Sequence, residues 1–222
     1  MIRVENVFVY NIANAVHASR NPLNSWDQSD SDFENDILGL RDLELAKRLC
    51  KAGPSHRKFM RQIFVSMDIT APLYFHKELD TYKVGTTANS CSTMHTIHKK
   101  PFKVSDFSTD HLGELPVSVN AGNPNEVTDE HYDFLYPLEY MVQELNMARN
   151  MYLQTKDKRY WYTMIQLLPS SYNQMRTITM NYENIVNIIG QRTGHKLDEW
   201  NEFVEKLKAL PYMEDFYGSI NG

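Results

Sequence analysis

The sequence predicts an α+β protein in which a small antiparallel or mixed sheet precedes a predominantly helical C-terminal half. Two segments of strand character lie early in the chain, and four stretches with the spacing of helices lie after residue 127. The 222 residues show no internal repeat and no strong boundary, which predicts one domain over 1–222. Within it, residues 103–127 contain two prolines and two glycines and are expected to form an irregular excursion.

The N-terminal part combines strand patterns, turn formers and short helical patterns. Every second residue from Ile63 to Ile69 is apolar, which is typical of a strand with one buried face. Gly53-Pro54 is expected to end the helix before this strand, and Pro72 fits the first turn of the helix after it. The predicted elements are, in order, a strand over 3–12, a polar loop over 21–32, a helix over 33–50, a strand over 62–69 and a helix from 70 to 79.

The C-terminal part is predicted to be all helix. Apolar residues recur three and four positions apart, and Pro169, Gly194 and Pro211 are expected to mark helix ends. The predicted helices cover 128–151, 159–168, 170–192 and 196–210, and Thr128 is expected to begin the first of them.

The composition excludes several classes of protein. Lys and Arg number 23 against 28 Asp and Glu, and this net charge of −5 disfavours broad electrostatic capture of nucleic acid. A local basic face such as His98-Lys99-Lys100 remains open. No apolar run approaches the roughly 20 residues that span a bilayer, and two cysteines are too few for a disulfide framework. We therefore expect a soluble, cytoplasmic protein.

Residues 81–94 are rich in small hydroxyl side chains and are expected to form a site loop. The hydroxyls and amides between Gly85 and Ser90, with Lys83 as the cation, suit a phosphate group. A turn that caps a helix explains the same composition equally well. The chain lacks the glycine patterns of a Rossmann crevice and of a P-loop, so neither of those phosphate sites is indicated.

Cys91, His95 and His98 have spacings of four and three, which would bring three soft side chains together on a helix. A structural zinc site needs four ligands, and no further cysteine pair supplies them, so we expect no metal. Cys91 as a nucleophile would use His95 as its base. The favoured interpretation of Cys91 is a small, half-buried side chain.

Asn181, Asn187 and Arg192 lie on the helix predicted over 170–192. The eleven residues from Asn181 to Arg192 are close to three helical turns, so these two side chains are expected on one face. An arginine binds phosphate or a pyrimidine carbonyl through paired hydrogen bonds. Near a helix end it is more often a solvated charge. Periodicity leaves both interpretations open.

These motifs resemble the flavin-dependent thymidylate synthase family over a stretch from about His56 to Trp200. That family has an Arg-His-Arg triplet followed, after a short spacer, by Asn-Glu-x-Ser-x-Arg-Tyr. The matching positions here are His56, Ala71-Pro72, Asn89-Ser-Cys-Ser92, Leu167-Leu-Pro169, and Asn181, Asn187 and Arg192 at the family's spacing. The departures are Thr81-Tyr82-Lys83 in place of the triplet, Ser90 in place of the Glu, Met94 in place of the signature Arg, and Glu183 in place of an Arg that contacts flavin.

The resemblance implies the fold of that family and a homotetramer with its sites between subunits. It implies a reaction in which reduced flavin, FAD in this family, delivers hydride, and methylenetetrahydrofolate supplies the methylene carbon to C5 of deoxyuridylate. By resemblance, Arg192 polarises the pyrimidine, Glu78, Lys83, Asn89, Ser90 and Ser92 hold the nucleotide, and His56, Asn181 and Asn187 face the flavin. The altered arginine positions leave a second interpretation, a binding or regulatory protein that keeps the fold and a nucleotide pocket without catalysis.

Overall fold

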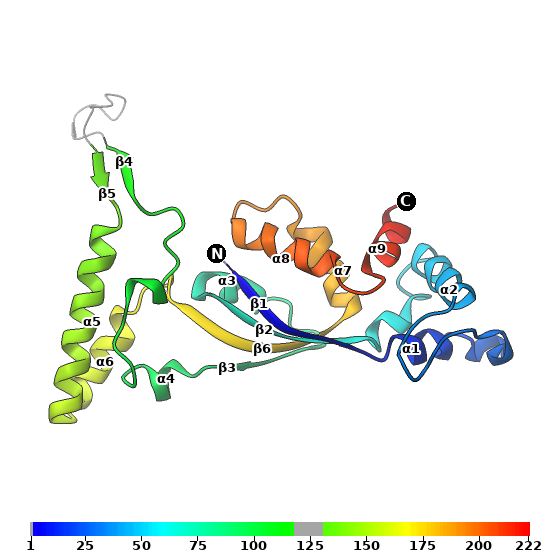
Figure 1. Cartoon of the computed structure of the whole chain (residues 1–222), viewed down its shortest axis with the longest axis horizontal. Helices are drawn as coiled ribbons and strands as arrows, with labels where there is room; N and C mark the ends of the chain where they lie inside the picture. Colours follow the sequence, from blue (N-terminus) through cyan, green and yellow to red (C-terminus); the bar gives the residue numbers. More distant parts are fainter. Residues whose placement is uncertain (1, 118–130) are drawn as a thin grey trace. The chain divides into compact units, whose positions relative to one another are not determined.

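The computed structural model describes residues 2–117 and 131–222 of the chain (Figure 1). The strands are β1 (Arg3–Tyr10), β2 (Phe64–Pro72), β3 (Thr86–Ser90), β4 (Glu114–Pro116), β5 (His131–Asp133) and β6 (Asn173–Asn181). The α-helices are α1 (Ile12–Ala18), α2 (Leu40–Lys51), α3 (Leu73–Leu79), α4 (Thr93–Thr96), α5 (Tyr136–Thr155), α6 (Lys158–Leu167), α7 (Tyr182–Arg192), α8 (Asp198–Lys208) and α9 (Met213–Asn221). None of the helices within the described ranges is long and apolar enough to cross a membrane.

The described chain divides into two compact units. The first, here called the sheet unit, consists of Ile2–Thr70, Phe75–Ser90 and Met175–Gly222. The second, here called the hairpin unit, consists of Ala71–Tyr74 and Cys91–Gln174. The expectation of a single domain over 1–222 stays a prediction.

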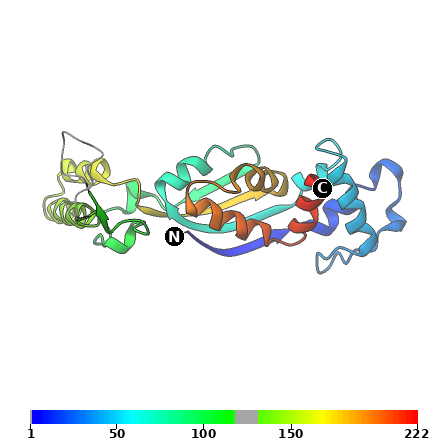
Figure 2. The ribbon, with the colours of Figure 1, turned by 90° about the horizontal axis from the view of Figure 1, so that it is seen from above.

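The sheet unit is built on a four-stranded sheet in the order β1-β2-β6-β3. β1 runs antiparallel to β2, with Tyr10 opposite Phe64, and β3 runs antiparallel to β6, with Ser90 opposite Arg176. Helices α7 and α8 cover one face of this sheet (Figures 1 and 2). The two edge strands are largely exposed, whereas every second residue of β2 from Val65 onward is buried. This mixture of a small antiparallel sheet and helices confirms the predicted α+β class.

The helix predicted over 170–192 is wrong in its first half, which forms β6. The physical reason is the position of this segment between two other strands. There Ile178 and Met180 are buried on one face of the sheet, and the backbone pairs with β3. The helical half, α7, begins only at Tyr182, and Asn181 caps it. Asn181 therefore does not share a helix face with Arg192.

The helix predicted over 33–50 is also shorter, since α2 begins at Leu40. The carboxylate of Asp30 accepts the backbone N–H groups of Arg41 and Asp42 at 2.9 and 3.1 Å, which starts the helix there. Residues 33–36 form a turn closed by pairing of Asp32 with Ile37.

The remaining predictions agree with the structure to different degrees. The predicted site loop over 81–94 contains strand β3, and the helix expected from residue 70 begins only after Pro72, as α3. The long helix α5 begins at Tyr136, and its predicted start at Thr128 lies outside the described residues. Residues 118–127 of the predicted 103–127 excursion lie outside them too. Helices α6 and α8 confirm the predictions over 159–168 and 196–210, and α9 was not predicted.

The hairpin unit is built on α5 and α6, which pack against each other. Its buried apolar cluster includes Leu145 on α5 and Met164 on α6, both 0% exposed. Asn146 holds the preceding loop against α5, because its amide donates to the backbone oxygen of Phe102 and accepts from the Phe102 N–H, each at 2.9 Å. The segment before the helices is therefore fixed to the hairpin by specific bonds.

Candidate functional site

Arg192, the last residue of α7, lies at the centre of a polar and aromatic cluster in the sheet unit. Its Nε donates to the hydroxyl of Tyr82 at 2.9 Å, and its Nη1 donates to Oε2 of Glu78 at 2.8 Å. The guanidinium carbon lies 4.5 Å from the ring centre of Trp200, close enough for a cation–π contact. The Arg192 side chain is 19% exposed, so the cation is held in place but reachable from solvent.

Glu78, near the end of α3, joins the members of this cluster. Its Oε2 also accepts a hydrogen bond from the indole Nε1 of Trp200 at 2.9 Å and lies 3.6 Å from Nε2 of His195. The Glu78 side chain is 36% exposed. A neutralised and orientated guanidinium therefore lies beside a carboxylate that is open to solvent, and this arrangement suits hydrogen bonding to a flat polar ligand.

The segment between α3 and β3 lies along α7 because Asn184 binds it. The Nδ2 of Asn184 donates to the backbone oxygen of Val84 and, at 2.9 Å, to the hydroxyl of Thr86. Asn181 caps α7 by accepting the Asn184 N–H at 2.9 Å. Gly85 has a φ of +72°, and a Cβ there would lie 2.4 Å from Nδ2 of Asn181, so this close approach requires glycine.

A second charged pair lies at the start of α7. Arg57 donates to Glu183 through Nε, at 3.1 and 3.3 Å to the two carboxylate oxygens, and through Nη2 at 3.0 Å. The two side chains are 9% and 13% exposed. Glu183 is one of the departures from the family's motif in the sequence, and this bidentate pairing neutralises its charge.

The structure brings together part of the predicted site. Arg192 and Glu78 are in direct contact, and the backbone next to Lys83 is bound to α7 through Val84, while the Lys83 side chain is exposed. Of the other predicted residues of the sheet unit, Asn181 is half-buried, and four are exposed: Asn89 and Ser90 on edge strand β3, His56 and Asn187.

Ser92 belongs to the hairpin unit, where its hydroxyl accepts the backbone N–H of His95 at 3.3 Å and caps α4. The expectation that Ser92 and Arg192 line one pocket stays a prediction. His95 and His98 also belong to this unit, and no metal-binding group of three or more His, Cys, Asp or Glu side chains occurs within residues 2–117 and 131–222.

The sequence does not predict four residues of the site: Tyr82, Trp200 and His195 of the Arg192 cluster, and Asn184 beside it. In the sequence, Tyr82 is only a departure from the family's triplet, and Trp200 is only a residue within the helix predicted over 196–210. His195 and Asn184 gave no signal, because each acts through a neighbour that only the fold brings near. The spacing from Asn181 to Arg192 is the one hint in the sequence, and it points to Arg192 alone.

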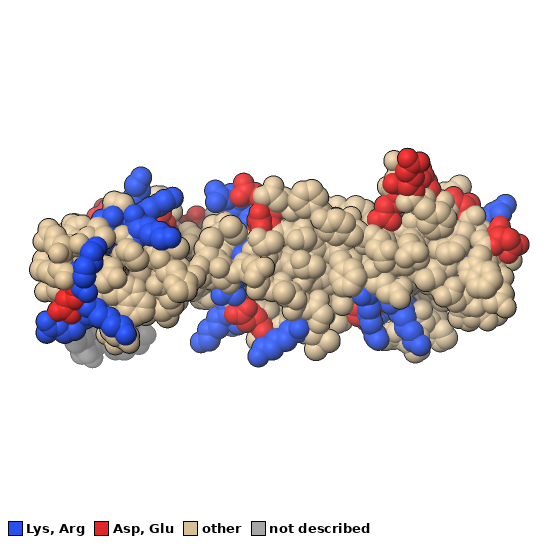
Figure 3. Space-filling model, turned by 90° about the horizontal axis from the view of Figure 1, so that it is seen from below, with Lys and Arg blue, Asp and Glu red and all other residues tan. Residues whose placement is uncertain are grey.

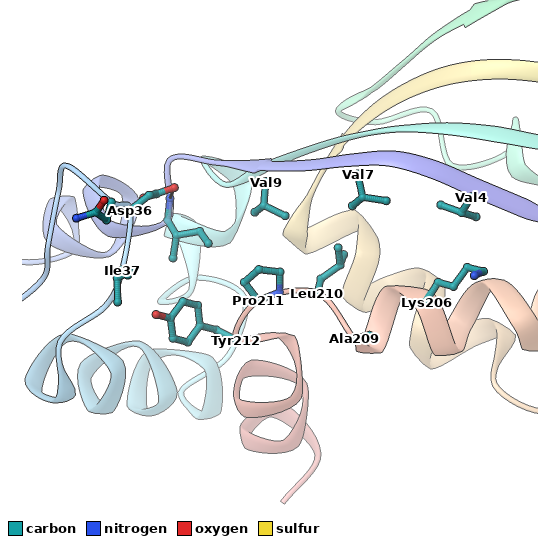
Figure 4. Close-up of a pocket in the computed structure, with 12 residues that line it drawn as sticks. Val4, Val7, Val9, Asp36, Ile37, Lys206, Ala209, Leu210, Pro211 and Tyr212 are labelled. Carbon is teal, nitrogen blue, oxygen red and sulfur yellow. Dashed lines mark hydrogen bonds between the residues drawn. The ribbon is translucent and has the colours of Figure 1, made fainter.

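A separate groove of about 850 Å³ lies between β1 and the corner that joins α8 to α9 (Figure 4). Val4, Val7 and Val9 of β1 point toward Leu210 and Tyr212 across it. None of the predicted site residues lines this groove. It is mostly apolar and does not belong to the Arg192 cluster.

The two cysteines are expected to differ sharply in reactivity. Cys50 is 1% exposed, and burial raises the pKa of its thiol to about 12, with Arg57 opposing the rise and Glu183 adding to it. Because the thiolate is the reactive form, Cys50 should resist alkylation. Cys91 is exposed, so the prediction of a half-buried side chain is wrong. Iodoacetamide at mildly alkaline pH should add one label to the folded chain, at Cys91, and two in denaturant. Cys91→Ser should remove the folded-state label, and equal labelling of both thiols in the folded protein would contradict this.

The fold is that of the flavin-dependent thymidylate synthases, which confirms the resemblance at the level of the fold. The chain is similar to thymidylate synthase X from Helicobacter pylori, solved with FAD and dUMP, with a TM-score of 0.68, 16% identity and coverage of 100% of both chains. A second structure from Helicobacter pylori, also with FAD and dUMP, has a TM-score of 0.64 and 18% identity over 97% of this chain and 100% of that one.

The chain is also similar to the UMP/dUMP methylase PolB from Streptomyces cacaoi, solved with 5-Br dUMP. That likeness has a TM-score of 0.61 and 14% identity, and it covers 100% of this chain and 94% of PolB. No protein-family model matches the sequence, and no curated protein does. The likeness to known proteins therefore lies in the fold.

Proposed function

We propose that this protein binds a pyrimidine nucleotide and FAD and methylates the base, with methylenetetrahydrofolate as the carbon donor. The observation that carries the proposal is the guanidinium of Arg192, held by Glu78, Tyr82 and Trp200. The solved structures that share the fold contain FAD with dUMP, or 5-Br dUMP. By its spacing from Asn181 and Asn187, Arg192 matches the arginine of the family's motif that polarises the pyrimidine.

The nucleotide base is proposed to lie against the Arg192 cluster. Arg192 donates directional, charged hydrogen bonds to a pyrimidine carbonyl, and Glu78 accepts from a ring N–H. Lys83, Asn89 and Ser90 are proposed to bind the ribose and phosphate, with Lys83 as the cation. These assignments rest on the family's motif and on the exposure of the side chains in the sheet unit.

The residues near the start of α7 fit a flavin in their chemistry. Asn181, Asn187 and His56 offer neutral hydrogen-bonding groups, and Asn187 and His56 are exposed. Glu183 would repel an anionic cofactor, but Arg57 neutralises it in a nearly buried pair. Reduced flavin, when bound, supplies hydride, and the protein supplies binding and orientation. A cytoplasmic homotetramer with shared sites belongs to the same proposal.

A second candidate is a protein that binds the nucleotide for regulation and does not catalyse. The salt bridge between Arg192 and Glu78 favours it, because the cation already has a carboxylate partner within the chain. The altered positions Tyr82 and Met94 point the same way. Visible absorbance of oxidised flavin in the purified protein supports the enzyme, and stabilisation by nucleotides without any flavin binding supports the second candidate.

Replacing Arg192 by Ala is expected to weaken nucleotide binding about tenfold or more, because a hydrogen bond from a charged group contributes about 1.5–3 kcal/mol. The rise in melting temperature on adding dUMP should be lost or strongly reduced. The melting temperature without ligand should change by only a few degrees, since the pairing with Glu78 is partly exposed to solvent. Differential scanning fluorimetry with dUMP and UMP measures both quantities.

Lys196→Ala, an exposed change a few residues away, is the matched control and should bind like the wild type. A large loss of stability in ligand-free Arg192→Ala would make Arg192 a structural residue. Unchanged stabilisation by dUMP in that variant would remove the proposed role of Arg192 in binding.

A further inference from the structure

The hairpin unit separates its charges along the chain. All seven of its Lys and Arg residues lie in the two segments 98–103 and 149–159, where Asp157 is the one acid. The described remainder of the unit contains six acidic residues and no Lys or Arg. The hairpin unit therefore concentrates its own positive charge on one part of its chain, and Figure 3 shows several Lys and Arg residues on the visible face of this unit, as well as others over the sheet unit.

The two basic segments are joined by specific contacts. Nε of Arg149 donates to the backbone oxygen of His98 at 2.9 Å. The rings of His98 and Tyr152 meet edge to face, with centres 5.2 Å apart. The turn that carries Lys99 and Lys100 is thus fixed beside the C-terminal end of α5, so the lysines of both segments belong to one surface.

Aromatic rings are interleaved with these cations. Lys156 lies over the ring of Tyr152 at 5.8 Å, and Lys158 lies over the ring of Tyr162 at 5.2 Å. A hollow of about 350 Å³ is lined by Tyr152, Lys156, Lys158 and Trp161. Tyr162 is 47% exposed, so part of its ring is open to solvent beside the ammonium of Lys158.

We propose that this basic aromatic face, formed by 98–103 and 149–162, binds single-stranded nucleic acid. Lysines spaced along a surface neutralise successive phosphates, and exposed aromatic rings stack on unpaired bases. An acidic peptide would satisfy the lysines but would leave the rings and the hollow without a partner. The proposal is independent of the proposed methylation, because it involves neither Arg192 nor the cluster around it.

Fluorescence anisotropy with a labelled oligothymidylate, on the full chain, tests the proposal. The logarithm of the affinity should fall with the logarithm of the salt concentration with a slope of about −3, as expected for about four phosphates contacted by a single strand. Lys99→Gln, Lys100→Gln and Lys158→Gln combined should weaken binding at least about tenfold and make the slope shallower. Lys51→Gln, Lys77→Gln and Lys206→Gln combined remove the same number of positive charges from exposed positions of the sheet unit. This control variant should bind the oligonucleotide nearly as tightly as the wild type.

Stacking is tested separately at Tyr162. Tyr162→Ala should weaken binding about fivefold or more, whereas Tyr162→Phe keeps the ring and should bind like the wild type. Equal weakening by the two sets of lysine changes would overturn the proposal, because it would indicate nonspecific charge attraction. Displacement of the oligonucleotide by polyglutamate at equal charge concentration, or no effect of Tyr162→Ala, would overturn it as well.

Discussion

Replacing Arg20 by Met is expected to lower the free energy of unfolding by about 3–5 kcal/mol, because it leaves a buried carboxylate without its cation. Arg20 and Asp42 are 6% and 0% exposed. Arg20 donates to Oδ1 of Asp42 through Nε at 2.7 Å and through Nη2 at 2.6 Å. The hydroxyls of Ser29 and Ser31 donate to Oδ2 at 2.5 and 2.6 Å. These four contacts hold the loop before α2 against the helix.

The urea-unfolding midpoint at neutral pH measures this loss, and Arg48→Met is the matched control. Arg48 is an exposed residue of α2, the helix that carries Asp42, so its replacement should change the free energy of unfolding by no more than about 0.5 kcal/mol. The double variant Arg20→Met with Asp42→Asn should recover a large part of the loss, since no unpaired charge remains. Similar stabilities for Arg20→Met and Arg48→Met would show that the pair does not stabilise the fold.

The difference between the wild type and Arg20→Met should depend on pH. Burial raises the pKa of Asp42, but hydrogen bonds from Ser29, Ser31 and Arg20, with the charge of Arg20, outweigh it, so the pKa lies below the ordinary 3.8. A lowered carboxyl pKa stabilises the folded state at pH values above 3.8, and this contribution is lost as the pH falls through the folded pKa. The stability difference should therefore narrow in acid, where the carboxylate takes up a proton.

Phe75→Ala should lower the free energy of unfolding by about 3–5 kcal/mol through the cavity that it leaves. Phe75, on α3, is 0% exposed, and its ring centre lies 4.6 Å from that of Trp200 and 5.7 Å from that of Phe203. The loss should reach the candidate site, because Trp200 carries the guanidinium of Arg192 on its ring. Chemical denaturation gives the stability, and dUMP-dependent melting gives the effect on the site.

Phe8→Ala is the control for Phe75. Phe8 is 54% exposed on edge strand β1, so its truncation should cost much less, within about 1 kcal/mol. A comparable loss in both variants would show that Phe75 is not a central core residue. Full nucleotide binding by folded Phe75→Ala would show that Arg192 does not depend on the packing beneath Trp200.

Local patterns were informative where one face of an element is buried and the other is not. The alternation from Ile63 to Ile69 predicted β2, and the helical spacing of apolar residues predicted α6 and α8. The spacing of apolar residues follows the number of residues after which a side chain returns to the same face of a strand or a helix. That number is fixed by the backbone geometry alone. The spacing of Asn181 and Arg192 likewise led to the resemblance that the fold confirms.

The same local reasoning failed where neighbours distant in the sequence decide the structure. Residues 173–181 became the strand β6 because β2 and β3 flank them, and this pairing overrides a weak preference for helix. Arg192 contacts Glu78, Tyr82 and Trp200 in the candidate site. Glu78 and Tyr82 lie 110 or more positions before Arg192 in the chain. Spacing along a single element carries no information on such contacts. The periodic elements and the candidate cation were thus predictable from the amino-acid order, whereas the partners of that cation were set by packing between segments far apart in the chain.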